Sequence, residues 1–287
     1  PQVDLALSRR DHVALGTALA LVAMPIVTAV LGGQNTTFTL VLIAAVWYLN
    51  AIGSPVWAGL AAGAMFFKPQ FGVVVLVALV VARRWRSAVA GMVVAIGMFL
   101  VGVATSGAGW LGDWLDQVRE FGDLNAEANG ELFVNITGFV QHVLGDGATA
   151  TLVGASVWVF VAAVTALIVW RDRLSWSTIG VVGAAVILLA PSALYYDSGV
   201  GIVTGLVAGL GAPGIVGIVA GTLAATWLQA LENTLGWSPL FFVLLAVWAW
   251  QTVRSSRAGG VSQAPGTLAA PAGQEQRSSG WRAIRSS

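Results

Sequence analysis

Between Asp11 and Arg83 the chain carries a single charged residue, Lys68. Only 9% of the 287 residues are charged and 57% are hydrophobic, whereas about a quarter of the residues of a soluble domain are charged. Uncharged runs such as 12–31 and 88–103 approach the roughly 20 helical residues that cross a hydrocarbon layer of about 30 Å. Because the alternating pattern of a membrane β-barrel is absent, these runs predict an all-α fold, that of a polytopic helical membrane protein.

Glycine and proline divide the apolar sequence into about ten predicted membrane segments. These segments are 12–32, 37–52, 54–67, 70–82, 88–106, 150–170, 176–196, 199–211, 213–229 and 238–253. Several are shorter than a full span, so half-spans, tilted helices and re-entrant segments stay open as alternatives.

The distribution of charge predicts how these segments are oriented. Arginines cluster at 9–10, 83–86, 171–173 and 254–257. By the positive-inside rule these clusters are predicted to face the cytoplasm. The stretch 110–147 instead holds seven acidic residues and one arginine, Arg119, so it is predicted to lie outside. An even number of crossings must then separate the first two clusters, and we expect 54–82 to cross twice, with a break at Pro69.

This topology predicts that the polar residues around Gln34, Lys68 and Asp197 meet at the outer face. We therefore expect a multi-pass protein of the cell membrane with an extracytoplasmic active face and a cytoplasmic C-terminus. The predicted organisation is a helical transmembrane domain over 1–254 and a disordered cytoplasmic tail over 255–287, which is rich in Ser, Gly, Ala and Pro.

Lys68 lies within the run Met-Phe-Phe-Lys-Pro-Gln. A bare ammonium among membrane residues costs on the order of 2.5–3.5 kcal/mol, so a position that tolerates it usually meets an anion. One interpretation makes Lys68 a point charge for a phosphate or carboxylate, assisted by Gln70. The other is a snorkelling lysine that marks the end of a short helix.

Two more polar groups follow predicted spans. Gln34 and Asn35 come after a Gly-Gly pair and offer amides to a sugar or phosphate, or simply form a helix end and a turn. Asp197 could orient a sugar hydroxyl or act as a base, and Tyr196 could stack on a sugar ring. The alternative for this second group is an interfacial aromatic belt with a solvated aspartate.

The outer acidic loop at about 108–147 contains an amphipathic pattern. Trp110, Trp114 and Val118 recur every four residues, which predicts a helix over about 109–122 lying on the outer leaflet. Asn135 and His142 are further polar candidates in this loop, without a recognisable spacing.

Several chemistries find no support in the composition. The chain has no cysteine, so disulfides and thiol catalysis are excluded. Its two histidines belong to no cluster with metal-ligand spacing, and we expect no metal site. Nothing indicates a cofactor or a nucleic-acid partner.

A series of motifs in order resembles a known family. The motifs are Gly33-Gln34-Asn35, Ala58-Gly59 with Gly63, Lys68-Pro69-Gln70, Arg83-Arg84-Trp85-Arg86 and Ala190-Pro191 with Tyr196-Asp197. Over about residues 12–210 the chain resembles the polyprenol-phosphate-dependent glycosyltransferases of the GT-C superfamily, specifically the GT87 (DUF2029) mannosyltransferase-like group. The resemblance implies a fold of many membrane helices with an outer active site. It also implies membrane lipids as surroundings, a hexose or pentose donor on polyprenyl phosphate, and a lipid-anchored or periplasmic glycan acceptor.

The same resemblance implies roles for individual residues. Lys68 would contact the donor phosphate, with Gln34, Asn35 and Gln70 nearby, and Tyr196 would belong to the late motif. The family's catalytic aspartate lies in an outer loop after its first helix, upstream of the Gly-Gln-Asn element, and no residue here fills that place. Because the chain begins without methionine, we expect that N-terminal helices with this loop are missing from it; the alternative is that Asp197 has taken the role.

Two other classes of function stay open. Broken, glycine-rich helices also suit a secondary transporter or flippase, although a transporter holds its polar residues near the midplane rather than at one face. A structural membrane subunit is the third class, in which Lys68 and Asp197 only mark helix ends.

Overall fold

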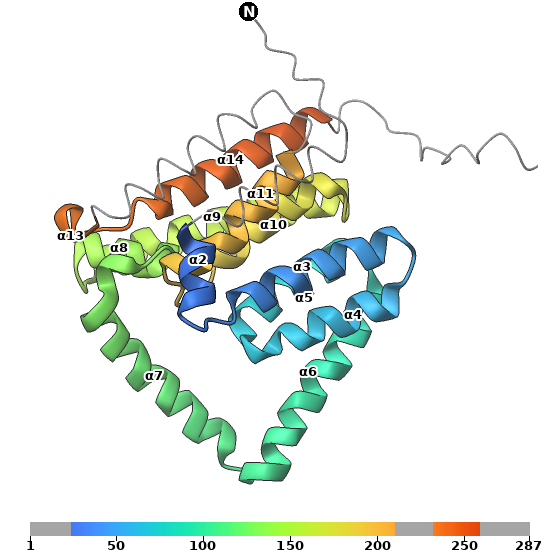
Figure 1. The fold of residues 1–287 in the computed structure, drawn as a ribbon, viewed down its shortest axis with the longest axis horizontal. Helices are drawn as coiled ribbons and strands as arrows, with labels where there is room; N and C mark the ends of the chain where they lie inside the picture. The colour runs from blue at the N-terminus through green and yellow to red at the C-terminus, as the bar shows by residue number, and fades with distance from the viewer. Residues whose placement is uncertain (1–23, 210–231, 259–287) are drawn as a thin grey trace, which may run out of the picture.

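The computed structural model describes residues 24–209 and 232–258 (Figure 1). Every regular element in these two ranges is a helix, and the backbones of Phe133 and Leu194 add one isolated antiparallel bridge. The architecture agrees with the all-α fold expected of a helical membrane protein. The predicted segment 213–229 lies outside the described residues, as do the first part of segment 12–32 and most of the tail 255–287.

The described helices range in length from 3 to 25 residues. In order they are α2 (Met24–Leu31), α3 (Thr36–Ala51), α4 (Pro55–Ala64), η1 (Met65–Phe67), α5 (Pro69–Val81), α6 (Trp85–Ser106), α7 (Trp110–Asn129), η2 (Gly130–Leu132), α8 (Ile136–Leu144), α9 (Ala148–Asp172), α10 (Trp176–Leu188), η3 (Tyr195–Asp197), α11 (Ser198–Gly209), α13 (Glu232–Leu235) and α14 (Leu240–Ala258).

Helix α10 forms the centre of the bundle. All its residues from Thr178 to Leu188 are buried, and it packs against α3, α5, α9, α11 and α14. A helix that is apolar all round has no preferred outer face, which is why it takes the central place. Gly183 allows α11 to approach closely, because a Cβ there would lie 1.9 Å from the hydroxyl oxygen of Thr204.

Helices α4, η1 and α5 form the hairpin predicted for residues 54–82. Gly59 and Gly63 of α4 face α6, where added Cβ atoms would lie 2.3 Å from the carbonyl oxygen of Ser87 and 2.5 Å from the Cβ of Val94. Small residues four positions apart let two membrane helices pack with their backbones in close approach. The Ala-Gly-x-x-x-Gly motif is therefore a packing surface for α6.

The lengths of the helices bear on the predicted membrane segments. Helices α6 and α9 are long and apolar enough to cross a membrane, and α2 with α3, bent by 118°, would make a third span. The 13 residues of α5 extend only about 20 Å, less than a hydrocarbon core of about 30 Å. The described residues thus do not confirm ten spans, and the short hairpin agrees with the half-span alternative.

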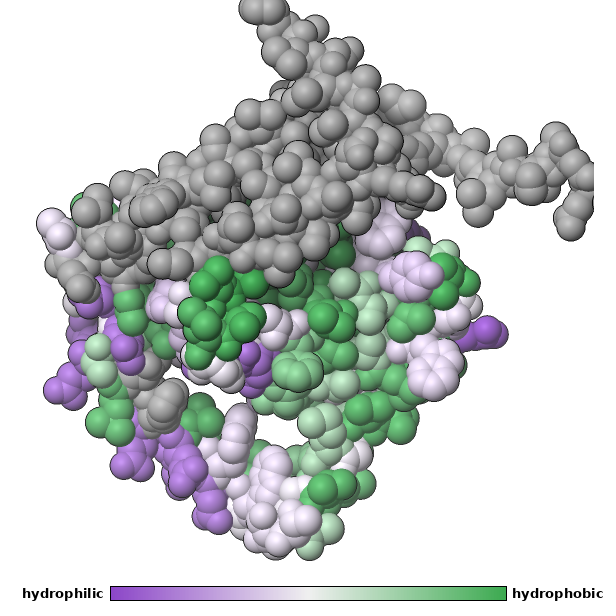
Figure 2. Space-filling view, viewed as in Figure 1, coloured by the Kyte–Doolittle hydropathy of each residue, from purple (hydrophilic) through white to green (hydrophobic). Residues whose placement is uncertain are grey.

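Helices α6 and α7 project from the bundle and meet in a V-shaped pair (Figure 1). The Trp110 ring packs edge-on against Phe99, with 5.3 Å between ring centroids, and closes the apex. Figure 2 shows open space between this pair and the bundle, and hydrophilic side chains along α7. The helix predicted over 109–122 exists and continues past Gly122 to Asn129.

One predicted segment was wrong in its last third. The span expected over 176–196 ends as a helix at Leu188, and the chain continues through an irregular segment to η3. Pro191 has no N–H to donate and disfavours helical conformation in the residue before it. Helix α14 in turn continues to Ala258, four residues past the domain boundary predicted after Arg254.

Candidate functional site

Lys68 lies at the tip of the α4–η1–α5 hairpin. Its backbone is non-helical, with φ −122° and ψ 83°, and Pro69 is the first residue of α5. Proline is favoured at that position because its missing N–H has no helical partner there, and its ring pushes the preceding residue out of the helical region. The Lys-Pro pair therefore ends one helix, starts the next and leaves the ammonium at the turn.

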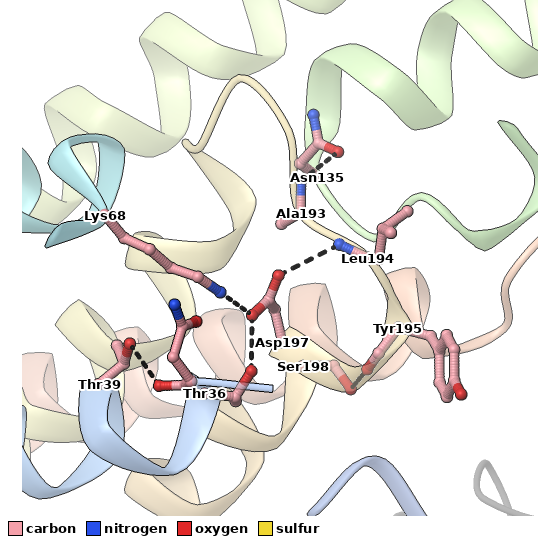
Figure 3. Close-up of polar contacts among 10 residues, drawn as sticks. Thr36, Thr39, Lys68, Asn135, Ala193, Leu194, Tyr195, Asp197 and Ser198 are labelled. Carbon is pink, nitrogen blue, oxygen red and sulfur yellow. Dashed lines mark hydrogen bonds and ion pairs between the residues drawn. The ribbon is translucent and has the colours of Figure 1, made fainter. Parts of the chain in front are cut away.

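The ammonium of Lys68 meets an anion of the same chain. Its Nζ atom donates a hydrogen bond of 2.8 Å to Oδ1 of Asp197, although the two residues are 129 positions apart (Figure 3). Asp197 is 4% exposed and the Lys68 side chain 16% exposed. The ammonium also lies 5.0 Å from the centroid of the Phe71 ring. The structure thus joins two of the predicted site residues in a largely buried ion pair.

Two further groups hold the carboxylate. The Thr36 hydroxyl donates a hydrogen bond of 2.8 Å to Oδ1, and the Leu194 amide lies at 3.5 Å from Oδ2 (Figure 3). The carboxylate is therefore bound from α3, from the hairpin tip and from its own loop. A buried carboxylate is tolerated only when it is paired and hydrogen-bonded, so this set explains how Asp197 stays buried.

Asn135 fixes the loop that carries Asp197. It is fully buried, its side-chain amide donates to the Pro191 carbonyl at 3.2 Å, and its side-chain oxygen accepts from the Ala193 amide at 3.3 Å. The Val134 amide donates to the Ala193 carbonyl at 3.0 Å. The sequence marked Asn135 only as one of several polar candidates. Its side chain bonds backbone groups more than 50 positions away, and such contacts leave no pattern in the sequence.

Gln34, Asn35 and Gln70 lie beside residues of this site in the sequence: Gln34 and Asn35 precede Thr36, and Gln70 follows Lys68 by two positions. Gln34 is half-buried and Asn35 exposed, at the turn before α3, where Gly33 has φ +64°. Gln70 is half-buried in the first turn of α5. Among the described residues, no hydrogen bond joins these three side chains to Lys68 or Asp197. They adjoin Thr36 or Lys68 in the sequence and are not partners of the ion pair.

Tyr196 is half-buried and packs edge-on against Tyr195, with ring centroids 5.6 Å apart. Burial, followed by the charges of Asp197 and Tyr195, raises the pKa of Tyr196 to about 12. Its hydroxyl therefore stays protonated at neutral pH and is available as a donor.

An apolar groove of about 140 Å³ lies between α5, α9 and α10. Its lining includes Val73, Val77, Trp158, Ala166 and Leu189. Val73 is in the second turn of α5, the helix that begins beside Lys68. The helix that begins beside Lys68 therefore also lines the apolar groove.

The chemistry of this site is that of a fixed cation. Over the described ranges, no cluster of three or more His, Asp or Glu side chains could hold a metal ion. A lysine ammonium has three N–H donors and Asp197 takes one of them, so the others suit the oxygens of an anionic ligand.

Comparison with known proteins gives one family. The model of glycosyltransferase family 87 matches residues 3–191, well over half of the chain. No curated protein and no solved structure matches it. The matched range contains Lys68, Thr36, Asn135 and the loop up to Pro191, while Asp197 follows it. The chain therefore belongs to glycosyltransferase family 87.

Proposed function

We propose that the protein is a membrane glycosyltransferase that transfers a hexose or pentose from a polyprenyl-phosphate-linked donor. The acceptor would be a lipid-anchored or periplasmic glycan, and transfer would occur at the outer face of the cell membrane. Family membership supports glycosyl transfer. The observation that carries the choice of donor is the Lys68 ammonium, held by Asp197 at the start of α5, the same helix that lines an apolar groove.

In this reaction the acceptor hydroxyl oxygen attacks the anomeric carbon of the sugar. The bond from that carbon to the phosphate oxygen breaks, its electron pair stays on the polyprenyl phosphate, and the hydroxyl proton passes to a base. Negative charge grows on the leaving phosphate, where a preorganised cation contributes most. Lys68 would stabilise this charge with the donors that Asp197 leaves free.

Asp197 would hold the ammonium in place. Its Oδ1 accepts from both Lys68 and Thr36, and its side chain is 6% exposed, so it fits a positioning role better than that of a proton acceptor for a large substrate. The role of Asp197 as the base stays a prediction, which the pH dependence of an Asp197→Asn variant would test. Gln34, Asn35, Gln70 and Tyr196 would supply neutral donors around the same phosphate or sugar.

The apolar groove supports a lipid-linked donor. Val73, Val77 and Trp158 give it an almost wholly apolar lining, and an isoprenoid chain offers only apolar surface. Burying such surface contributes about 25 cal/mol per Å². A phosphate at Lys68 with its chain along α5 would use both features together.

The membrane orientation rests on contacts at the other end of the bundle. Arg83 lies over the Trp170 ring, and Arg173 donates to the Ala82 carbonyl. The Arg254 guanidinium similarly bonds the Ala208 carbonyl. The arginines that follow α5 and α9 and those at the end of α14 therefore lie away from Lys68, which supports a cytoplasmic arginine end and an extracytoplasmic site.

Family membership favours an enzyme over the transporter or flippase and over a structural subunit. The test uses the full-length protein in membranes, with donors of radiolabelled hexoses and pentoses on polyprenyl phosphate. Lys68→Ala should lower sugar transfer by about 10²–10³-fold, the usual effect of losing one charge-stabilising donor. Arg86→Ala, an exposed cation at the arginine end, is the matched control.

Each variant also needs a measured unfolding temperature, so that loss of fold is told apart from loss of chemistry. Transfer that persists in folded Lys68→Ala would remove Lys68 from the site. Absence of transfer from every polyprenyl-phosphate donor by the wild type would contradict the proposed donor.

A further inference from the structure

A second, larger cavity lies beside α8, and it shares no residue with the Lys68–Asp197–Thr36 cluster. Its volume of about 760 Å³ is within the usual range of ligand pockets, about 300–1,000 Å³. Its polar lining consists of Glu127, Gln141, His142, Asp146 and Ser192. Neither the family match nor the Lys68 site gives this cavity a role.

Contacts of the backbone hold two parts of this cavity's wall in place. The Asn135 side chain holds the segment from Pro191 to Ala193, which lines one side. On the other side, a Cβ at Gly130 would lie 2.9 Å from Nδ1 of His142, so the chain comes close to the imidazole there. The cavity is thus built from α7, η2, α8, the turn before α9 and the loop that leads to Asp197.

His142 has a defined orientation. Its Nε2 atom lies 2.5 Å from the carbonyl oxygen of Gly236, and a carbonyl only accepts, so Nε2 carries the proton. In the neutral ring Nδ1 is then an acceptor, on the edge that lies beside Gly130. His142 therefore lines the cavity with a hydrogen-bond acceptor.

The charge of the cavity selects against anions. Glu127 and Asp146 bring two carboxylates, and no lysine or arginine is among the lining residues. Arg119, the one basic residue of 110–147 other than histidine, is ion-paired with Asp116 at 3.0 Å and lines no part of the cavity. Carboxylates accept strongly from hydroxyl groups and repel phosphates and uronates.

We propose that this cavity binds the acceptor as a neutral, hydroxyl-rich glycan. Sugar hydroxyls donate to Glu127, Asp146 and Nδ1 of His142, while Gln141 and Ser192 offer both donors and acceptors. This inference rests on the proposed function, because it assigns the two substrates of the transfer reaction, the donor and the acceptor, to two sites of different charge. The anionic donor belongs to Lys68 and the neutral acceptor to the carboxylate cavity, and one loop, from Pro191 to Asp197, borders both.

The test measures glycan binding without the transfer reaction. The full-length protein in nanodiscs is applied to an array of neutral hexose and pentose oligosaccharides beside uronic-acid and sulfated oligosaccharides. We expect retention of neutral oligosaccharides only. Glu127→Gln combined with Asp146→Asn should weaken this binding at least about tenfold, since each carboxylate contributes a charge-assisted hydrogen bond.

Two more variants make the test specific. Glu120→Gln removes a carboxylate two turns earlier on the same face of α7, outside the cavity, and should bind as the wild type does. Ser192→Trp fills the cavity without changing its charge and should abolish binding. Retention of anionic oligosaccharides equal to that of neutral ones, no neutral binding by the wild type, or unchanged binding in both cavity variants would each overturn the inference.

Donor binding, measured on the same samples with a polyprenyl-phosphate hexose, separates this inference from the proposed function. We expect the cavity variants to bind the donor as the wild type does. If the wild type does not bind the donor but does bind neutral glycans, the proposed donor is refuted and the cavity assignment stays in place.

Discussion

Replacing Lys68 with methionine should destabilise the protein more than replacing Asp197 with asparagine, although both changes break the same ion pair. Asp197 is 4% exposed, whereas the Lys68 side chain is 16% exposed. Lys68→Met keeps the aliphatic part of the side chain but leaves a buried carboxylate with the Thr36 hydroxyl and a distant amide. Removing one partner of a buried pair costs about 3–5 kcal/mol, because the other charge stays buried and uncompensated.

Asp197→Asn leaves a different situation. The asparagine oxygen still accepts from Thr36, and the more exposed ammonium of Lys68 can turn toward water. We expect a cost of about 1–3 kcal/mol, the value of lost hydrogen bonds to a charged group. The double variant carries neither charge, so its cost should be smaller than the sum of the single costs by about 2 kcal/mol.

The assay is reversible unfolding in mixed micelles, followed by tryptophan fluorescence during titration with a denaturing detergent. All four members of the cycle are measured at one pH and one lipid composition. Equal costs for the two single variants, or a coupling energy below about 0.5 kcal/mol, would refute the reasoning, because the pair would then be neither buried nor coupled.

Three further predictions follow from packing, from hydrogen bonding and from titration. Gly63→Val should separate α4 from α6 and lower the free energy of unfolding by at least about 1–3 kcal/mol, because even a Cβ at Gly63 would lie 2.5 Å from the Cβ of Val94. Gly97→Ala, with open space at its Cβ, is the control. Equal effects of the two substitutions would contradict the close packing. Asn135→Ala should cost about 2 kcal/mol or more and speed hydrogen exchange across the segment before Asp197, because two backbone groups lose their partner; unchanged exchange would contradict the bracing role. The difference in absorbance between wild type and Tyr196→Phe during an alkaline titration should have its midpoint near pH 12, since burial disfavours the phenolate, and a midpoint near the ordinary value of about 10 would contradict the burial.

The positions of the helices were largely predictable from the sequence, because helix breaks are local. Pro69 disfavours helix in the residue before it, and glycines at 33 and 53 take positive φ at the turns. The hairpin over 54–82 follows from this chemistry together with the count of crossings. The helix expected over 109–122 is present, but the prediction ended it too early, because amphipathic spacing alone does not mark where a helix ends.

Other errors and omissions arose where distant residues compete with local preference. The span predicted over 176–196 ends at Leu188, and Asn135 supplies the hydrogen bonds that helical partners would have given the loop. Nothing near Asn135 in the sequence indicates that it meets Pro191. The cavity beside α8 was likewise not predictable, because its lining comes from several helices and loops that are separate in the sequence.

The sequence by itself determined that this chain is apolar and predicted that it is helical, and it indicated that a charge at Lys68 would meet an anion, with a snorkelling lysine as the alternative. That conclusion is energetic and local, since the cost of an unpaired ammonium depends only on its apolar surroundings. Only the tertiary structure decided which anion it meets within the chain. Asp197 is 129 positions away, so no periodicity or spacing links the two, and packing of α3, the hairpin and the η3 loop brings them to 2.8 Å.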